Sequence, residues 1–102
     1  MVERIGFGIR DHNHTDKSRY KVYDGFADEG WFYTNKKDAM KKAVKLLDRI
    51  PYVFVYQVKK EQYAHEFMGR LVKDIGPSGE RAKWIPRYGR PRYLNRDGSF
   101  KR

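Results

Sequence analysis

The sequence predicts a small single domain of the α+β class, in which an antiparallel sheet of three to four strands carries one or two helices on one face. Several short segments are rich in β-branched and aromatic residues, which is typical of strands. A segment near the middle repeats apolar residues at helical spacing. The chain has 102 residues, enough for one domain with a modest core.

Three segments in the first third of the chain predict strands by their alternation of apolar and polar residues. These segments are residues 4–10, 19–26 and 31–33. The polar residues 11–18 predict a loop between the first two strands. Asp and Gly residues within 24–30 predict a turn before the third.

The clearest predicted element is a helix over residues 36–49. Asn35 is suited to the N-cap position, and Asp38 lies three residues later, as in a capping box. Apolar residues then recur three and four positions apart, which gives the helix one buried face. Pro51 ends the helix, because a proline disfavours helical geometry in the residue before it.

Two further elements are predicted after this helix. Residues 52–58 read YVFVYQV and predict a central strand. Residues 60–74 repeat apolar side chains at helical spacing and are followed by a Gly-Pro stop, so they predict a second helix. Gly69 is unfavourable inside a helix. The competing interpretation places residues 67–74 in a strand that pairs with 52–58.

These patterns divide the side chains between a core and an open sheet face. The core is expected to contain Ile5, Phe7, Val22, Phe32, Ala43, Val44, Leu47, Val53, Val55 and Leu71. The open face is expected to present Tyr20, Tyr33, Tyr52, Tyr56 and the C-terminal segment.

The positive charge of the chain is concentrated at its C-terminal end. The net charge is +10 and the isoelectric point is about 9.9, a balance that attracts polyanions. Fifteen basic residues oppose 12 acidic ones up to residue 80, whereas eight oppose one from residue 81 onward. We therefore predict a compact domain over residues 1–76 and a basic extension, rich in Arg and aromatic residues, over 77–102.

The C-terminal extension interleaves cations, aromatic rings and prolines. It is expected either to be disordered alone or to lie across the sheet with Trp84 and Ile85 as an anchor. An Arg guanidinium fits phosphate oxygens two at a time, and aromatic faces accept stacked bases. This mixture predicts a non-enzymatic nucleic-acid-binding protein with weak sequence preference, assisted by two lysines of the first helix. The expected binding residues are Arg81, Lys83, Trp84, Arg87, Tyr88, Arg90, Arg92, Tyr93, Arg96, Lys37 and Lys41.

The lysine-rich helix resembles part of a known family. Residues 35–47 read NKKDAMKKAVKLL, which is similar to the last helix of double-stranded RNA-binding domains: that helix opens with a Lys-Lys pair and also follows strands. The resemblance implies phosphate contacts by Lys36, Lys37 and Lys41. The chain departs from the family because a strong strand follows this helix and no helix is predicted at its start.

Two segments that contain histidine suggest metal binding or catalysis. The segment Asp11-His12-Asn13-His14 contains a His-x-His pair that suits a divalent metal, but a short polar turn is the simpler interpretation, and no metal or cofactor is expected. His65, beside Glu66, suits the general base of a small toxin-like ribonuclease. An exposed histidine on the predicted second helix is the simpler interpretation.

Two alternatives to nucleic-acid binding stay open. One is a protein-interaction module, a regulator or inhibitor of phage or mobile-element type, whose basic face docks on an acidic protein; the other is the ribonuclease. A short sheet with exposed edges can also pair with itself, which allows a homodimer. The chain has no Cys, no apolar leader and no membrane-spanning run, so a cytoplasmic protein without a membrane partner is expected.

Overall fold

Residues 10–59 and 64–101 are described by the structure, a computed structural model. The described part confirms the α+β class, but its strands exceed the predicted three to four. The elements in chain order are β1 (Arg10–His12), β2 (Tyr20–Asp24), β3 (Glu29–Tyr33), α1 (Lys36–Leu46), β4 (Tyr52–Lys59), β5 (Ala64–Lys73), β6 (Ala82–Pro86) and β7 (Arg92–Leu94).

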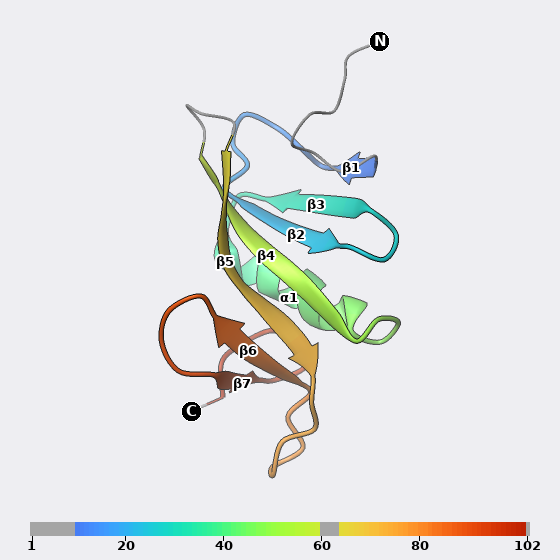
Figure 1. Cartoon of the computed structure of the whole chain (residues 1–102), viewed down its shortest axis with the longest axis vertical. Helices are drawn as coiled ribbons and strands as arrows, with labels where there is room; N and C mark the ends of the chain where they lie inside the picture. Colours follow the sequence, from blue (N-terminus) through green and yellow to red (C-terminus); the bar gives the residue numbers. More distant parts are fainter. Residues whose placement is uncertain (1–9, 60–63, 102) are drawn as a thin grey trace.

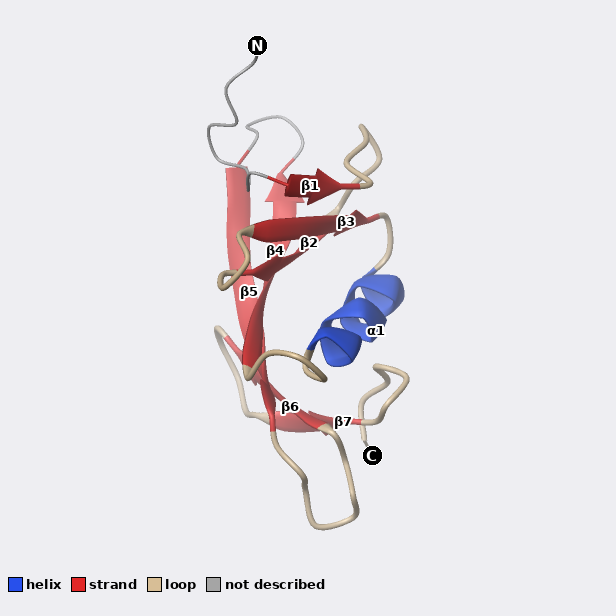
Figure 2. Cartoon of the chain, turned by 90° about the vertical axis from the view of Figure 1, so that its right-hand side faces the viewer, coloured by secondary structure: helices blue, strands red, loops and turns tan. Residues whose placement is uncertain are grey.

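All seven described strands belong to one sheet, in the spatial order β1-β3-β2-β4-β5-β6-β7 (Figure 1). Neighbouring strands are antiparallel except β1 and β3, which are parallel. The strand predicted at the centre, β4, is the fourth of the seven. Figure 2 shows that α1 lies on one side of the curved sheet, so the other face of the central strands is left open.

The helix begins where the sequence predicts. The side-chain oxygen of Asn35 accepts a hydrogen bond from the backbone N–H of Asp38 (2.9 Å), which is an N-cap. The helix ends at Leu46, before the predicted end at residue 49, because the next three N–H groups bond only three residues back. Within the described residues, no helix combines the length and apolar character needed to cross a membrane.

The predicted second helix is wrong. The described residues from Ala64 to Lys73 form β5, a strand between β4 and β6. The alternative interpretation, a strand over 67–74 paired with 52–58, is the correct one. Residues 60–63, where the helix was predicted to begin, lie outside the described residues.

A β-bulge in β5 explains this error. Val55 of β4 lies opposite Gly69, and the next residue, Tyr56, lies opposite Phe67, so Met68 is an extra residue in β5. The extra residue shifts the alternation of side chains by one position. Apolar residues before and after the bulge therefore stand three or four positions apart, which is the spacing of a helix.

The core lies between α1 and the sheet and agrees with prediction where it is described. The predicted residues Val22, Ala43, Val44, Leu47, Val53, Val55 and Leu71 are buried there. Phe32 is buried as well, but it lies opposite Lys21 on the other face of the sheet, where its ring contacts Lys21 and His65. Ile5 and Phe7 lie outside the described residues, as does most of the strand predicted over 4–10. Arg10, the last residue of that predicted strand, is the first residue of β1. The other two residues of β1, Asp11 and His12, were predicted to lie in the loop.

The C-terminal segment contributes to the same core. Ala82 and Trp84 of β6 and Leu94 of β7 are buried in the main apolar cluster. β6 pairs with β5 along five residues, and Trp84 lies opposite Leu71. A division of the chain at residues 76 and 77 stays a prediction, which the truncation described in the Discussion tests.

The two faces of the sheet differ from prediction at two tyrosines. Tyr20 and Tyr33 are paired across β2 and β3 and pack against the core on the side of α1, so their expected place on the open face is wrong. Tyr20 shares a face with the buried Val22 because strand residues two apart point the same way. Tyr52 and Tyr56 flank the buried valines of β4 and lie on the open face.

Candidate nucleic-acid interface

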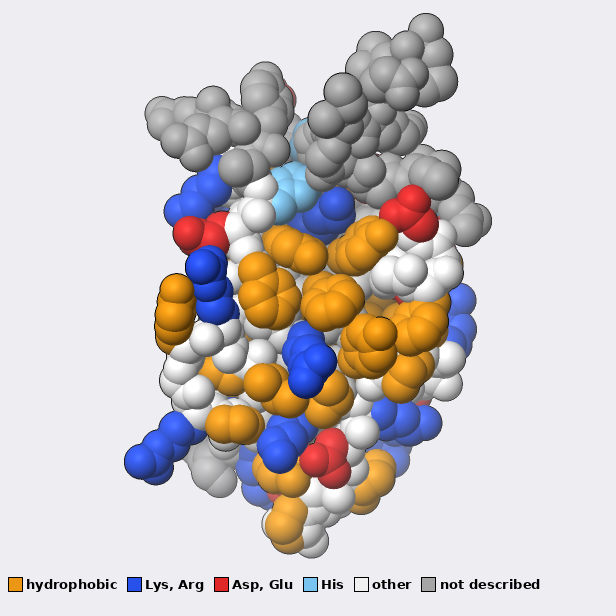
Figure 3. Space-filling model, in the orientation of Figure 1, with side chains coloured by type: hydrophobic (Ala, Val, Ile, Leu, Met, Phe, Trp, Pro, Cys, Tyr) orange, Lys and Arg blue, Asp and Glu red, His pale blue; other side chains and the backbone are white. Residues whose placement is uncertain are grey.

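A set of aromatic rings covers the open side of the central strands. In β4 the rings of Tyr52, Phe54 and Tyr56 alternate with two valines that point into the core. The strand register adds one ring from each neighbouring strand, and the β2–β3 turn adds another. We call this set the aromatic face: Tyr23, Phe26, Tyr52, Phe54, Tyr56 and Phe67. Apolar side chains gather at the centre of this side of the molecule in Figure 3.

The rings of the aromatic face form a continuous row. Ring centroids are 5.1 Å apart for Phe26 and Tyr52, and 5.5 Å apart for Tyr52 and Phe54. Phe67 lies 6.1 Å from Phe54 and 5.7 Å from Tyr56. These separations are typical of tilted and edge-to-face aromatic pairs, which hold one another in place. Phe26 is 57% exposed, and the other four rings of this row are partly exposed, so each of the five has some surface open to solvent.

Tyr23 extends the row onto β2 and is fixed by a hydrogen bond. Its hydroxyl donates to Oδ1 of Asp28 over 2.6 Å. This bond to a carboxylate, with burial as the second cause, raises the pKa of Tyr23 to about 12. The ring is therefore neutral and held beside Phe54, its partner across β2 and β4.

A half-buried polar corner borders the aromatic face. His65 lies on β5, with its ring 6.4 Å from that of Tyr56, so the prediction of an exposed helical histidine is wrong. Burial, with the positive charges of Lys21 and His14 as further causes, lowers the pKa of His65 to about 4. Burial also lowers the pKa of Lys21. The imidazole of His65 is consequently neutral at pH 7.

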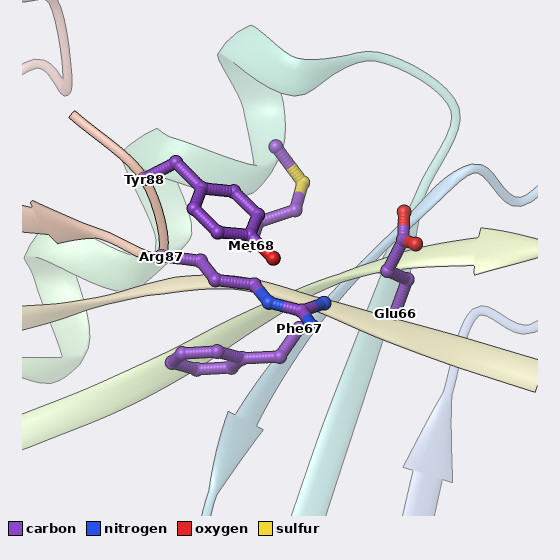
Figure 4. A pocket seen from close by; sticks show the side chains of 5 residues that line it. All are labelled: Glu66, Phe67, Met68, Arg87 and Tyr88. Carbon is purple, nitrogen blue, oxygen red and sulfur yellow. The ribbon is translucent and has the colours of Figure 1, made fainter.

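Two arginines lie at the border of the rings. Arg70 is exposed on β5 and lies directly opposite Phe54. Arg87 follows β6, and its guanidinium carbon lies 5.1 Å from the ring centre of Tyr88, which is 79% exposed. A pocket of about 340 Å³ joins this turn to the aromatic face (Figure 4); it is lined by Glu66, Phe67, Met68, Arg87 and Tyr88. Backbone phosphates and bases both find partners in such a mixture.

The structure separates the cations and rings predicted from the sequence. Arg81 forms an ion pair with Asp48, and Trp84 is only 6% exposed within the core, so these two side chains support the fold. Lys83 and Tyr93 lie opposite each other on β6 and β7, 5.9 Å from ammonium to ring centre. They share the open face but lie toward its β7 edge.

The remaining predicted residues lie nearer the helix or in turns. Lys37 and Lys41 are exposed on α1, where the turn around Gly98 packs against the Lys41 backbone. Arg96 is exposed in that turn. Among the described residues, no carboxylate forms an ion pair with Arg87, Arg90, Arg92 or Arg96.

The two histidines of the His-x-His segment contact different neighbours. Nε2 of His12 lies 3.1 Å from a carboxylate oxygen of Glu29, and the His12 ring stacks on Trp31. The His14 ring instead contacts Phe32 edge-on, with centroids 4.5 Å apart. Within residues 10–59 and 64–101, no three potential ligands come together as a metal site requires.

Sequence reasoning missed four members of the aromatic face: Tyr23, Phe26, Phe54 and Phe67. One signal was present, because the three rings of YVFVY stand two residues apart and must share a face of any strand. Phe67 was assigned to the predicted second helix instead, because the bulge gives its segment the apolar spacing of a helix.

The resemblance of α1 to the last helix of double-stranded RNA-binding domains does not extend to the order of elements. Strands precede α1, as in that family, but four more strands follow it in the described part of the chain. Comparisons of the chain with family models, curated proteins and solved structures found no match.

Proposed function

We propose that this protein binds single-stranded nucleic acid on its aromatic face, without catalysing a reaction. The observation that carries the proposal is the continuous row of partly exposed rings on an open sheet face of a chain with net charge +10. Stacking of a base on an aromatic ring contributes about 1–3 kcal/mol and tolerates any base. Weak sequence preference follows from this mode of binding.

Single strands suit the aromatic face better than duplexes do. A duplex buries its bases in the helical stack, whereas an open strand exposes base faces to the rings of Phe54 and Phe67. Arg70 and Arg87 lie at the border of the same rings, where the phosphates of a bound strand pass. Arg90 and Arg92 extend this positive border beyond Tyr88.

A fluorescence anisotropy titration tests the proposal. The probes are labelled DNA and RNA strands of about 12 nucleotides, within the site size of small β domains, and the matching duplexes. We expect tighter binding of single strands. We also expect the logarithm of the affinity to fall with the logarithm of the salt concentration with a slope near −3, if about four arginines contact phosphates. Failure of every strand to bind at low salt would contradict the proposal.

Two ring variants locate the binding surface. Phe54→Leu and Phe67→Leu keep an apolar side chain in the strand but remove the stacking face. Together they should weaken binding by at least about 2 kcal/mol, roughly thirtyfold. Ile75→Ala is the control for loss of an exposed apolar side chain, because Ile75 is 67% exposed in the β5–β6 connection and does not belong to the aromatic face. Unchanged affinity in the double variant would exclude the aromatic face as the site.

The same samples separate the two alternative functions. A docking module for an acidic protein would retain such a protein and bind none of the oligonucleotides. A small ribonuclease would shorten the RNA strand on a denaturing gel, and His65→Phe would prevent this. Under the proposed function the strand stays intact after incubation, and only its mobility in the complex changes.

A further inference from the structure

A second pocket, of about 350 Å³, lies on the helix side of the molecule beside the turn that follows β6. Lys36 at the start of α1 and Arg90 and Arg92 near β7 supply three cations to its lining. The rings of Trp84, Tyr88 and Phe100 line it as well. None of the described residues that line this pocket is acidic, so the pocket is positively charged.

Two of the cations converge on one ring. The guanidinium carbon of Arg92 lies 4.3 Å from the ring centre of Phe100, and the ammonium of Lys36 lies 5.5 Å from the same centre. A ring face stabilises a cation only partly, and like charges brought together repel. The N-terminal end of α1 adds a further partial positive charge. An anion placed between these groups would remove the repulsion and pair with each of them.

The size and lining of the pocket define the anion. A volume of about 350 Å³ lies at the small end of ligand pockets, which suits a phosphate with part of one nucleotide. Arginine and lysine supply charged donors for the phosphate oxygens. Aromatic side chains beside those donors suit the sugar and base of the same nucleotide.

The pocket is connected to the aromatic face. Met68 and Tyr88 line both this pocket and the one on the open side that contains Phe67 and Arg87. Figure 4 shows the ring of Tyr88 beside the side chain of Met68. A nucleic-acid strand that leaves the aromatic face past Tyr88 therefore reaches Lys36, Arg90 and Arg92.

We infer that this pocket binds the terminal phosphate of the nucleic-acid strand that lies on the aromatic face. This inference rests on the proposed function and adds the end of the strand to it. A terminal phosphate monoester carries up to two negative charges, whereas an internal phosphodiester carries one. The three cations therefore favour an end over an internal position.

Oligonucleotides that differ only in their end groups test this inference. Single strands with a phosphate at either end should bind at least tenfold more tightly than the same strand with hydroxyl ends. Lys36→Gln should reduce that difference at least threefold and leave the affinity for the hydroxyl-ended strand unchanged, because Lys36 lines this pocket and does not line the pocket at the border of the aromatic face. Lys45→Gln is the control, because Lys45 is exposed on α1 and does not line the pocket.

The outcomes distinguish the inference from the proposed function. If all strands bind equally well whatever their ends, the pocket inference is wrong and the aromatic face remains. If no strand binds, the proposed function is wrong. A titration with uridine monophosphate and a second one with uridine, monitored through the ring resonances of Phe100, then test whether the pocket binds a phosphate. A shift with the monophosphate alone supports the inference, and no shift with either compound overturns it. Thermal melting of each variant confirms that it is folded.

Discussion

The backbone N–H of Arg87 donates to the carbonyl oxygen of Met68 over 2.8 Å, which ties the end of β6 to the bulge of β5. This bond places the Arg87 side chain beside Phe67, where both line the same pocket. A backbone close approach supports the arrangement: a Cβ on Gly69 would lie 2.6 Å from the carbonyl oxygen of Ile85 and 2.7 Å from the Trp84 ring. The bulge therefore requires glycine and positions a cation at the border of the aromatic face.

Replacing Arg87 should weaken binding in a salt-dependent way. Arg87→Gln removes one phosphate partner without touching a ring, so the slope of log affinity against log salt should become shallower by about 0.7. Arg49→Gln, a change at an exposed arginine after α1, should leave the slope unchanged. Anisotropy titrations at several salt concentrations measure both. An equal slope in Arg87→Gln and the unmodified protein would show that Arg87 does not contact phosphate.

The C-terminal strands are expected to be needed for folding. Trp84→Ala removes a ring that is 6% exposed and packed in the core, and should lower the free energy of unfolding by about 3–5 kcal/mol. Truncation after Gly79 removes Trp84 together with Ala82 and Leu94 and leaves β5 without its β6 partner, so it should abolish cooperative unfolding. Urea melts followed by circular dichroism measure both. A cooperative melt of the truncated chain would instead support an independent domain over residues 1–76.

Substitutions at two glycines test whether the turn at residues 95–99 packs on α1. Gly79 and Gly98 both have positive φ, +82° and +88°. A Cβ on Gly79 would meet no atom within 4 Å, whereas one on Gly98 would lie 2.7 Å from the backbone nitrogen of Lys41. Gly79→Ala should destabilise the protein by about 1–2 kcal/mol, the cost of a left-handed alanine. Gly98→Ala should cost more, because the turn must also move away from α1.

Equilibrium urea denaturation of the two glycine variants gives the comparison directly. The unmodified protein supplies the reference free energy of unfolding. Equal destabilisation by the two substitutions would mean that the turn at residues 95–99 does not pack on the helix in solution.

His65 should make the protein less stable in mild acid. Its pKa is lowered to about 4 in the folded protein, mainly by burial, whereas an unfolded histidine titrates near 6.5. Between these values the unfolded chain binds more protons, so the free energy of unfolding should fall as the pH falls from about 6.5 to 4 and should lose this dependence below pH 4. The contribution of His65 should not exceed about 1.4 kcal/mol per pH unit, the limit for one proton.

His65→Phe removes this titration while keeping a ring beside Tyr56. The difference in unfolding free energy between the unmodified protein and His65→Phe, measured by urea denaturation at several pH values, should change over that range and be constant above pH 7. Carboxylates such as Glu80 titrate equally in both proteins and cancel; burial raises the pKa of Glu80, but hydrogen bonds from Lys101 and from backbone N–H groups together lower it. A difference that does not vary with pH would show that His65 is not protected from protonation.

The local elements could be predicted from the sequence, and the long-range pairings could not. The N-cap at Asn35, the apolar stripe of α1 and the valines of β4 depend on nearby residues, so their patterns are visible in the chain. The helix predicted over 60–74 failed because the bulge in β5 exists only through pairing with β4. The C-terminal strands were missed for a similar reason, since β6 depends on β5 as its partner.

The candidate site was predicted in part. The charge distribution predicted binding by Arg87, Arg90 and Arg92; all three line pockets of the structure, and their binding stays a prediction. Trp84 was expected either to stack on a ligand or to anchor the C-terminal segment on the sheet, and its buried position opposite Leu71 agrees with the second expectation. The rings of Phe54 and Phe67 come from two strands, so their contact could be recognised only in the folded chain.

The most direct test of binding by the aromatic face is to record the aromatic ¹H–¹³C resonances of the protein during titration with a single-stranded oligonucleotide. The rings of Phe54, Tyr56 and Phe67 should shift strongly, because stacked bases lie over them. The rings of Tyr20 and Tyr33, on the opposite face of the sheet, should shift little. Large shifts of Tyr20 and Tyr33 with unmoved Phe54 and Phe67 signals would contradict the proposed interface.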